Sequence, residues 1–302
     1  MTQVLTLIAA APEPRLTIAA AAVAEALARL GAVLGRSETL APDIARDFFF
    51  TELAADQAEA AARLALAAAL GAHRIDLVAQ GAADRRKRLL LADMESTIIE
   101  NEMLDELADF LGLREEVAEI TRRAMNDEID FTAALKARVA LLKGLPESVL
   151  AEAASRIRIA PGAAALVATM RANGARTALV SGGFRVFTSL VRDRLGFDCD
   201  VANELLVAEG RLAGRVGTPI VTRETKLASL TQFAAERGLG LASTLAVGDG
   251  ANDLPMLDAA GLGIAYRAKP AVAARARNRI DHADLTALLY AQGYAAAEII
   301  FS

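Results

Sequence analysis

The sequence predicts an α/β protein in which a domain built on a parallel β-sheet follows a smaller α+β domain. From residue 89 onward, short apolar segments alternate with helical segments, which is typical of a parallel sheet covered on both faces. Residues 1–80 instead give the order β-α-β-β-α-β of a ferredoxin-like fold. A helical stretch at about 101–159 interrupts the alternation and predicts an insert. The 302 residues, 54% of them hydrophobic, are enough for two such domains.

The N-terminal unit, residues 1–80, is divided by its hydrophobic pattern. Apolar residues with helical spacing, Leu16, Val23 and Leu27 among them, predict a helix over about 16–30. A second helix is expected over about 56–70, and strands are expected at 4–9, 32–37, 45–51 and 74–79. Residues 81–88 are predicted to be a linker, and the basic run Arg85–Arg88 within it is expected to be solvated.

The second domain is predicted to span residues 89–302. Its expected strands are 89–92, 176–180, 244–247 and 262–265, with a helix over about 163–173. Residues 199–216, CDVANELLVAEGRLAGRV, predict a β-hairpin that turns at Glu209-Gly210.

Composition and missing motifs exclude several classes of function. The net charge is −5 and no basic run exceeds Arg85–Arg88, so we expect no nucleic-acid partner. The apolar segments are too short to span a membrane, and the N-terminus lacks the positive charge of a signal peptide. A single cysteine, Cys199, excludes an internal disulfide and favours a reducing cytoplasm. His73 and His282 lack metal-ligand spacing and no P-loop is present, which leaves carboxylates as the reactive groups.

Acidic residues follow two of the predicted strands. In LLLADMESTIIENE, Asp93 and Glu95 come directly after a strand, and Asp249 and Asp253 follow another in GDGAND. The carboxyl ends of parallel strands meet at one edge of a sheet, so we expect these carboxylates to converge. Four close carboxylates require a cation, and ligands that are all oxygen favour Mg²⁺ over zinc.

The same edge is predicted to bind phosphate. Ser181, Gly182 and Gly183 end another strand, and Lys226 begins a helix in TRETK. A serine hydroxyl, glycine N–H groups and a lysine can hold phosphate oxygens that Mg²⁺ leaves free. Asp93 would then attack phosphorus to give an aspartyl-phosphate, while Glu95 would protonate the leaving alcohol and later activate water.

Each motif alone has a simpler interpretation. An acidic strand end is usually a helix cap or a turn, Ser-Gly-Gly is a common turn, and a lone Lys226 would be a solvated lysine. Their occurrence together, each at a strand end or a helix start, favours catalysis.

These residues resemble the motifs of haloacid dehalogenase-like phosphatases, and among them the phosphoserine phosphatases. The first motif, Asp-x-Asp-Ser-Thr, corresponds to DMEST; Ser181 and Lys226 match the second and third motifs, and GDGAND is the fourth. The resemblance covers roughly residues 89–290, and the helical insert corresponds to the cap of the family. It implies a Rossmann-like phosphatase domain with a helical cap that uses Mg²⁺ and hydrolyses O-phosphoserine.

The resemblance also implies a set of substrate-binding residues. Glu102 would bind the substrate ammonium, and Arg138, in ARVALLKGL, would bind the carboxylate by a bidentate pair. Met125 and Phe131 match apolar positions that close over the substrate, and Asn252 belongs to the fourth motif. The simpler interpretations are a surface cation for Arg138 and a first-turn helix acid for Glu102.

One residue departs from the family pattern. Glu95 stands where the family has aspartate, and its extra methylene shifts the carboxyl by about one C–C bond length. The family contact with the metal at this position comes from the backbone carbonyl, which the change leaves intact, so we expect retained activity.

Several alternatives remain open. The N-terminal unit resembles ACT-type regulatory domains in its predicted topology, which makes serine binding there a hypothesis, and a homodimer is possible. A related phosphatase or phosphotransferase acting on another small phosphomonoester is the nearest alternative function. A non-catalytic amino-acid sensor is the other.

Overall fold

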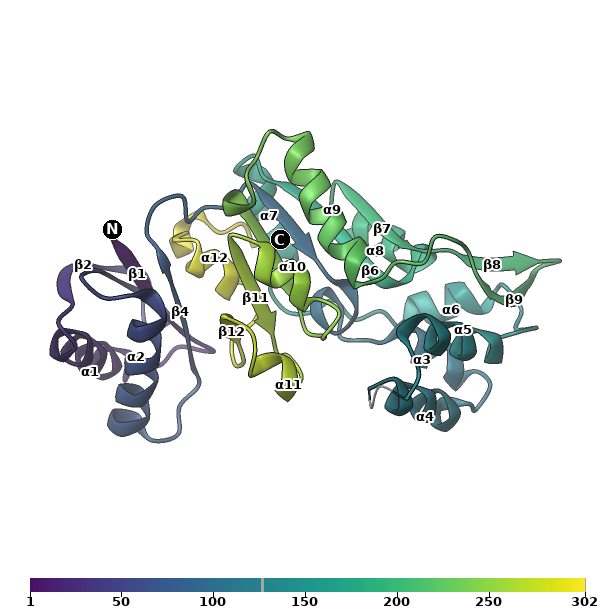
Figure 1. The fold of residues 1–302 in the computed structure, drawn as a ribbon, viewed down its shortest axis with the longest axis horizontal. Coiled ribbons are helices and arrows are strands. Elements are labelled where there is room, and N and C mark those ends of the chain that lie inside the picture. Colours follow the sequence, from purple (N-terminus) through teal and green to yellow (C-terminus); the bar gives the residue numbers. More distant parts are fainter. Residues whose placement is uncertain (126–127, 302) are drawn as a thin grey trace.

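Two sheet-based domains lie side by side in the computed structural model, which describes residues 1–125 and 128–301 (Figure 1). The N-terminal domain is a four-stranded antiparallel sheet in the order β2-β3-β1-β4 with two helices on one face. This confirms the ferredoxin-like prediction. Its elements are β1 (Gln3–Ala9), α1 (Leu16–Arg29), β2 (Val33–Ala41), β3 (Ala45–Thr51), α2 (Ala55–Leu70) and β4 (Ile75–Gly81).

The two faces of this small sheet contact different partners. Leu5 and Leu7 on β1 are buried in a cluster with the apolar sides of α1 and α2. Ile8 on β1 and Val78 on β4 belong instead to the main hydrophobic cluster of the molecule, together with Leu288 of the second domain. The second domain therefore covers the sheet face that the helices leave open.

The second domain has a six-stranded sheet in the order β12-β11-β10-β5-β6-β7, with every neighbouring pair parallel. The chain moves from β5 outward through β6 to β7 and then returns to the other side of β5, so the strand order reverses between β5 and β10. Such a switch point opens a crevice at the carboxyl edge. The strands are β5 (Leu89–Ala92), β6 (Arg176–Phe184), β7 (Cys199–Asn203), β10 (Thr244–Gly248), β11 (Leu262–Tyr266) and β12 (Asn278–Ile280).

Helices cover both faces of this sheet, as the apolar strand sequences predict. Leu90 and Ala92 of β5 pack with the cluster that includes α7, α8 and α12, whereas Leu89 and Leu91 pack against α9 and α10. The helices are α7 (Ala163–Ala172), α8 (Arg185–Leu195), α9 (Arg223–Glu236), α10 (Leu254–Ala259), α11 (Pro270–Ala273) and α12 (Ala287–Ala291), with 3₁₀ turns η2 (Leu241–Ser243) and η3 (Ala296–Glu298).

The predicted helical insert lies at the far end of the molecule from the N-terminal domain (Figure 1). A two-stranded hairpin, β8 (Leu205–Ala208) and β9 (Arg211–Val216), packs beside it, with a bridge from Arg211 to Pro146. The insert consists of α3 (Met103–Asp109), α4 (Arg114–Met125), α5 (Phe131–Leu141) and α6 (Val149–Ser155).

The prediction of one hairpin over 199–216 was wrong in its first part. Cys199–Asn203 is β7, an edge strand of the main sheet that pairs in parallel with β6, and the hairpin begins only at Leu205. Local alternation cannot distinguish a hairpin strand from a partly covered sheet edge, because both present one exposed face.

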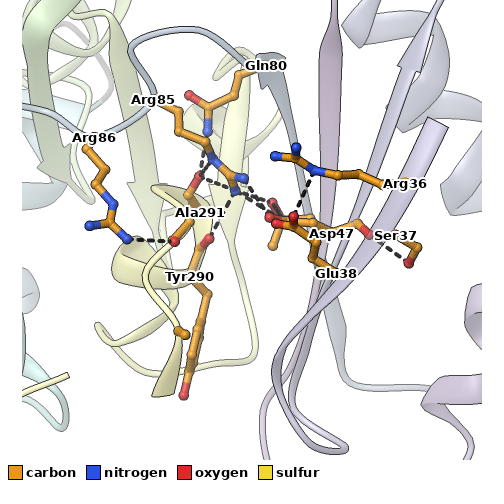
Figure 2. A network of polar contacts seen from close by, with 12 residues as sticks. Arg36, Ser37, Glu38, Asp47, Gln80, Arg85, Arg86, Tyr290 and Ala291 are labelled. Atoms are coloured by element: carbon orange, nitrogen blue, oxygen red, sulfur yellow. Dashed lines mark hydrogen bonds and ion pairs between the residues drawn. The ribbon is translucent and has the colours of Figure 1, made fainter. Parts of the chain in front are cut away.

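The prediction of a solvated basic run before β5 holds for Arg86 and Arg88, which are exposed, but is wrong for Arg85 and Lys87. The Arg85 guanidinium lies between the domains, where it pairs with Asp47 at 2.5 Å, donates to Thr6 Oγ1 at 3.0 Å and donates to the Ala291 carbonyl at 3.0 Å (Figure 2). Asp47 is fully buried and Lys87 is 7% exposed. An arginine whose side chain is only 11% exposed joins the small sheet to the end of α12 through several acceptors.

A second contact joins the domains through a carboxylate. Asp76 on β4 is 3% exposed and accepts hydrogen bonds from the backbone N–H groups of Asp281, His282 and Ala283 at 2.8 to 3.3 Å. The loop after β12 is thereby held against the N-terminal sheet.

We predict that Arg85→Ala lowers the free energy of unfolding by roughly 3–5 kcal/mol, because it leaves Asp47 buried without its cation. Arg29→Ala is the control, since Arg29 pairs with Glu25 on an exposed helix surface, where ion pairs contribute little. Chemical denaturation measures both. Equal losses for the two variants would contradict a structural role for the buried pair.

Candidate active site

Three aspartates meet at the carboxyl edge of the main sheet. Asp93 follows β5, and Asp249 and Asp253 lie in the loop after β10, the neighbouring strand. One carboxylate oxygen from each lies within 4.8 Å of the others, and all three residues are buried. The parallel register makes this possible, because the pairing of Ala92 with Val247 ends both strands at one level.

A lysine lies between two of these carboxylates. Lys226, in the first turn of α9, is 1% exposed, and its Nζ is 2.8 Å from Asp93 Oδ1 and 2.7 Å from Asp253 Oδ1. Burial alone would lower the pKa of Lys226, but the charges of Asp253 and Asp93 outweigh it and raise the pKa above its ordinary value. The lysine is therefore a permanent cation in the site.

One lysine does not compensate three buried carboxylates. Burial, followed by the charge of Asp253, raises the pKa of Asp93 to about 8 even though Lys226 opposes the rise. The same two causes raise the pKa of Asp249 to about 6. A buried set of oxygen ligands with an excess of negative charge fits a divalent cation.

Glu95 lies in the turn η1 (Met94–Ile98), whose backbone is not helical at Glu95 and is left-handed at Ser96, with φ 54°. Its Oε1 accepts a hydrogen bond from the N–H of Met103, the first residue of α3, at 2.9 Å. The carboxylate of Glu95 is thus outside the group of three aspartates, although the sequence prediction placed it among the metal ligands. Burial, then the nearby Glu102, raise the pKa of Glu95 to about 8.

The Ser181–Gly183 segment lies against Glu95. A Cβ added to Gly183 would come within 2.8 Å of Glu95 Oε2, so only glycine leaves room for the carboxyl group. Ser181 is 1% exposed, and its Oγ accepts the N–H of Gly183 at 3.0 Å, which leaves its hydroxyl hydrogen to donate elsewhere.

The helical insert brings an apolar and a cationic residue to the site. A Cβ on Gly182 would be 3.3 Å from Cζ of Phe131, so the Phe131 ring lies over this segment. The guanidinium of Arg138 donates to the Ala134 carbonyl at 3.4 Å and to the Thr121 hydroxyl at 3.3 Å, and in the described part of the chain it forms no ion pair. Burial lowers the pKa of Arg138, and the charges of Glu95, Asp105 and Glu102 oppose this effect.

The remaining predicted residues differ in how the structure places them. Glu102 is exposed, and its Oε1 accepts a hydrogen bond from Ser96 at 2.7 Å. Asn252 is partly buried in the loop that carries Asp249 and Asp253. Met125 is the last residue of α4, and its side chain lies outside the described part of the structure.

Sequence reasoning missed two polar residues near the site. Lys269 Nζ is 4.0 Å from Asp249 Oδ2, and the buried amide of Asn203 contacts the Gly182 carbonyl. Both follow strands, Asn203 at the end of β7 and Lys269 shortly after β11. Their signal was the strand-end position that identified Asp93.

A family model for haloacid dehalogenase-like hydrolases matches residues 90–258, more than half of the chain. The chain belongs to the haloacid dehalogenase-like hydrolases. The matched segment runs from β5 to α10 and includes the three aspartates, Lys226 and the helical insert.

Curated proteins extend the similarity. The chain is 46% identical over 199 residues to a protein named phosphoserine phosphatase from Streptococcus thermophilus, which covers 66% of this chain and 93% of that one. It is 44% identical over 233 residues to a phosphoserine phosphatase from Streptomyces coelicolor, covering 77% of this chain. The chain spans 57% of the length of this longer relative.

Solved structures match the chain as well. An unliganded probable phosphoserine phosphatase from Vibrio cholerae covers 98% of this chain and 88% of its own at 30% identity, with a TM-score of 0.76. A phosphoserine phosphatase solved as an analogue of a phospho-aspartyl intermediate covers 68% of this chain and 98% of its own at 39% identity, with a TM-score of 0.64. Among the described residues, no helix has the length and apolar character needed to cross a membrane.

We predict that Gly183→Ala lowers turnover about 10-fold or more with little change in Tm, because the new methyl group forces Glu95 from its position. The displaced group is the end of a flexible side chain, so the fold is expected to tolerate it. Gly240→Ala is the control, since a Cβ there meets nothing within 4 Å. Turnover at the wild-type rate by folded Gly183→Ala would show that Glu95 does not need its observed position.

Proposed function

We propose that this chain hydrolyses O-phosphoserine to serine and phosphate through a phosphorylated Asp93, with Mg²⁺ as cofactor. The observation that carries the proposal is the Arg138 guanidinium, which is partly buried in the helical insert and has no ion pair among the described residues. A guanidinium in this state is suited to a carboxylate that arrives with the substrate.

The charges of the site match those of phosphoserine from end to end. Lys226 lies 2.8 Å from Asp93, where that carboxylate would meet a phosphoryl group, and the Ser181 hydroxyl would bind another phosphate oxygen. Arg138 would bind the substrate carboxylate, and the exposed Glu102 carboxylate would bind the ammonium. Phe131, 39% exposed and lying against Gly182, would cover the bound substrate.

Mg²⁺ would be held by Asp93, Asp249 and Asp253, together with the backbone carbonyl of Glu95. Buried oxygen ligands with excess negative charge favour this cation over zinc. When bound, Mg²⁺ supplies positive charge that keeps the carboxylates ionised and neutralises phosphate oxygens.

Asp93 is the nucleophile in this proposal. Its carboxylate oxygen forms a bond to phosphorus as the bond from phosphorus to the serine oxygen breaks, which gives an aspartyl-phosphate. Lys226, 2.8 Å from Asp93, favours the ionised nucleophile and lies where it can bind a transferred phosphate oxygen. Water then attacks the phosphorus and releases phosphate.

Glu95 is the general acid and the general base in this proposal. Its pKa of about 8 keeps it protonated at neutral pH, so it can donate a proton to the departing serine oxygen. The resulting carboxylate can then accept a proton from the attacking water. One residue thus acts first as acid and then as base.

The relatives support this proposal. The proteins similar to this chain from Streptococcus thermophilus and Streptomyces coelicolor are named for phosphoserine phosphatase activity. The analogue of a phospho-aspartyl intermediate is of a phosphoserine phosphatase with the same fold, which supports an aspartate nucleophile. The single Cys199 favours a reducing cytoplasm as the location, and a homodimer stays a prediction.

Release of phosphate from O-phosphoserine with Mg²⁺ tests the proposal. Asp93→Asn should reduce this release to background, because it removes the nucleophile. Arg138→Ala should lower kcat/KM for phosphoserine by roughly 100-fold, the worth of a charge-assisted bidentate contact, but change turnover of an aryl phosphate little. Lys136→Ala, on the same helix with an exposed side chain, is the matched control. Equal losses on both substrates would indicate another phosphomonoester as the substrate.

We predict that Mg²⁺ binds more tightly as the pH rises from 6 to 8. Without the cation, Asp93 has a pKa of about 8 and Asp249 of about 6, so protons must leave when Mg²⁺ binds. A raised carboxyl pKa stabilises the cation-free fold fully below the unfolded value near 3.8, and this stability is lost as the pH rises towards 8. Added Mg²⁺ should therefore raise Tm more at pH 8 than at pH 6.

Calorimetry in two buffers of different ionisation enthalpy should detect the released protons at pH 7. Asp93→Asn, which has no proton to release at this position, should release fewer. Binding of Mg²⁺ that is independent of pH would show that these carboxylates are not its ligands.

A further inference from the structure

A buried amide bridges the two segments that hold the phosphate-binding groups. Asn203, at the end of β7, is 1% exposed. Its Nδ2 donates to the Gly182 carbonyl at 2.7 Å, and its Oδ1 accepts the N–H of Val221 at 2.8 Å. Both hydrogen-bonding ends of the side chain are therefore used, one by the backbone of β6 and the other by the segment before α9.

The first segment needs this support because it leaves the sheet ladder. The pairing of β6 with β7 is regular up to Val180, shifts register, and resumes only where Phe184 pairs with Asn203. Ser181, Gly182 and Gly183 lie within this register shift. The Gly182 carbonyl therefore accepts a hydrogen bond from the Asn203 side chain. The Asn203 amide thus holds the backbone directly next to Ser181.

The second segment leads directly into the helix that carries Lys226. Val221 precedes Thr222, the N-cap of α9, and the N–H of Thr222 donates to Thr225 Oγ1 at 3.1 Å. Lys226 follows in the first helical turn, with its Nζ between Asp93 and Asp253. Fixing the Val221 N–H therefore fixes where α9 begins.

We propose that Asn203 is a positioning residue that sets the distance between Ser181 and Lys226. The inference rests on the proposed function, in which these two groups bind the same phosphoryl group. Asn203 itself touches no reacting atom. It acts by holding both binding groups in the geometry that the phosphoryl group requires, and small errors in such geometry are costly for catalysis.

A residue with this role has a kinetic signature of its own. Asn203→Ala should lower kcat/KM about 10- to 100-fold for phosphoserine and for an aryl phosphate alike, because both substrates present a phosphoryl group. Inhibition by inorganic phosphate should weaken in parallel. Arg138→Ala, by contrast, should affect phosphoserine alone.

Asn203→Asp provides a second variant of nearly the same shape. It keeps an acceptor for the Val221 N–H but loses the donor to Gly182 and sets a carboxylate against that carbonyl. We expect the same loss on both substrates and the same weakening of phosphate inhibition. This variant keeps the test decisive if Asn203→Ala does not fold.

Gln292→Ala is the matched control. Gln292 is fully buried and also bridges two backbone segments, donating to the Leu288 carbonyl at 2.9 Å and accepting the N–H of Lys87 at 2.9 Å. Those partners lie in α12 and in the segment before β5. We expect Gln292→Ala to lower Tm and to leave kcat/KM and phosphate inhibition within about twofold of wild type, since no site residue depends on it.

Kinetics are measured below the Tm of every variant. The inference is overturned if the Asn203 variants lose only thermal stability, as Gln292→Ala should, or if phosphate inhibition is unchanged. It is also overturned if phosphoserine and aryl phosphate turnover fall by different factors. Failure of the proposed function is a separate result, because wild type would then not hydrolyse phosphoserine while the Asn203 effect could still be read on the aryl phosphate.

Discussion

The contact on which the site depends is the buried ammonium of Lys226 between Asp93 and Asp253. Three carboxylates at one strand edge would repel one another and resist burial, and this cation allows them to remain close. The compensation is incomplete, because the raised pKa values of Asp93 and Asp249 show that negative charge is still in excess. That excess is what suits the site to a divalent cation, whose charge would balance the carboxylates.

Much of this arrangement could be predicted from the sequence, and for one reason. Parallel strands end at a common edge, so a polar residue that follows an apolar strand is placed in space by its position in the chain. This rule was enough to bring Asp93, Asp249 and Asp253 together and to place Ser181 near the end of β6, the strand beside β5. Lys226 required more, since a helix start is not tied to the sheet by register. Lys226 was assigned to the site from the order of the motifs along the chain.

What could not be predicted depends on contacts between distant parts of the chain. The burial of Arg85 requires Asp47 from the N-terminal sheet and the carbonyl of Ala291 from α12, more than 200 residues away. A basic run next to a domain boundary has no local feature that distinguishes this state from a solvated one. The role of Asn203 could not be predicted for a related reason. The alternation of apolar and polar residues around it fits a hairpin as well as a sheet edge, and only the pairing with β6 distinguishes the two.

Glu95 shows how one side chain can serve two opposite tasks. Burial and the nearby Glu102 favour its protonated form, whereas the Met103 N–H at the start of α3 and the charge of Arg138 favour its ionised form. At neutral pH the protonated form of Glu95 is the more populated one. The difference between the two forms is small enough for Glu95 to ionise when the leaving group takes its proton. Because α3 and Arg138 both belong to the helical insert, the element that would recognise the substrate also adjusts the proton affinity of the acid. A longer side chain than aspartate is compatible with this task, since Glu95 reaches from the end of β5 to the insert and still has room against Gly183.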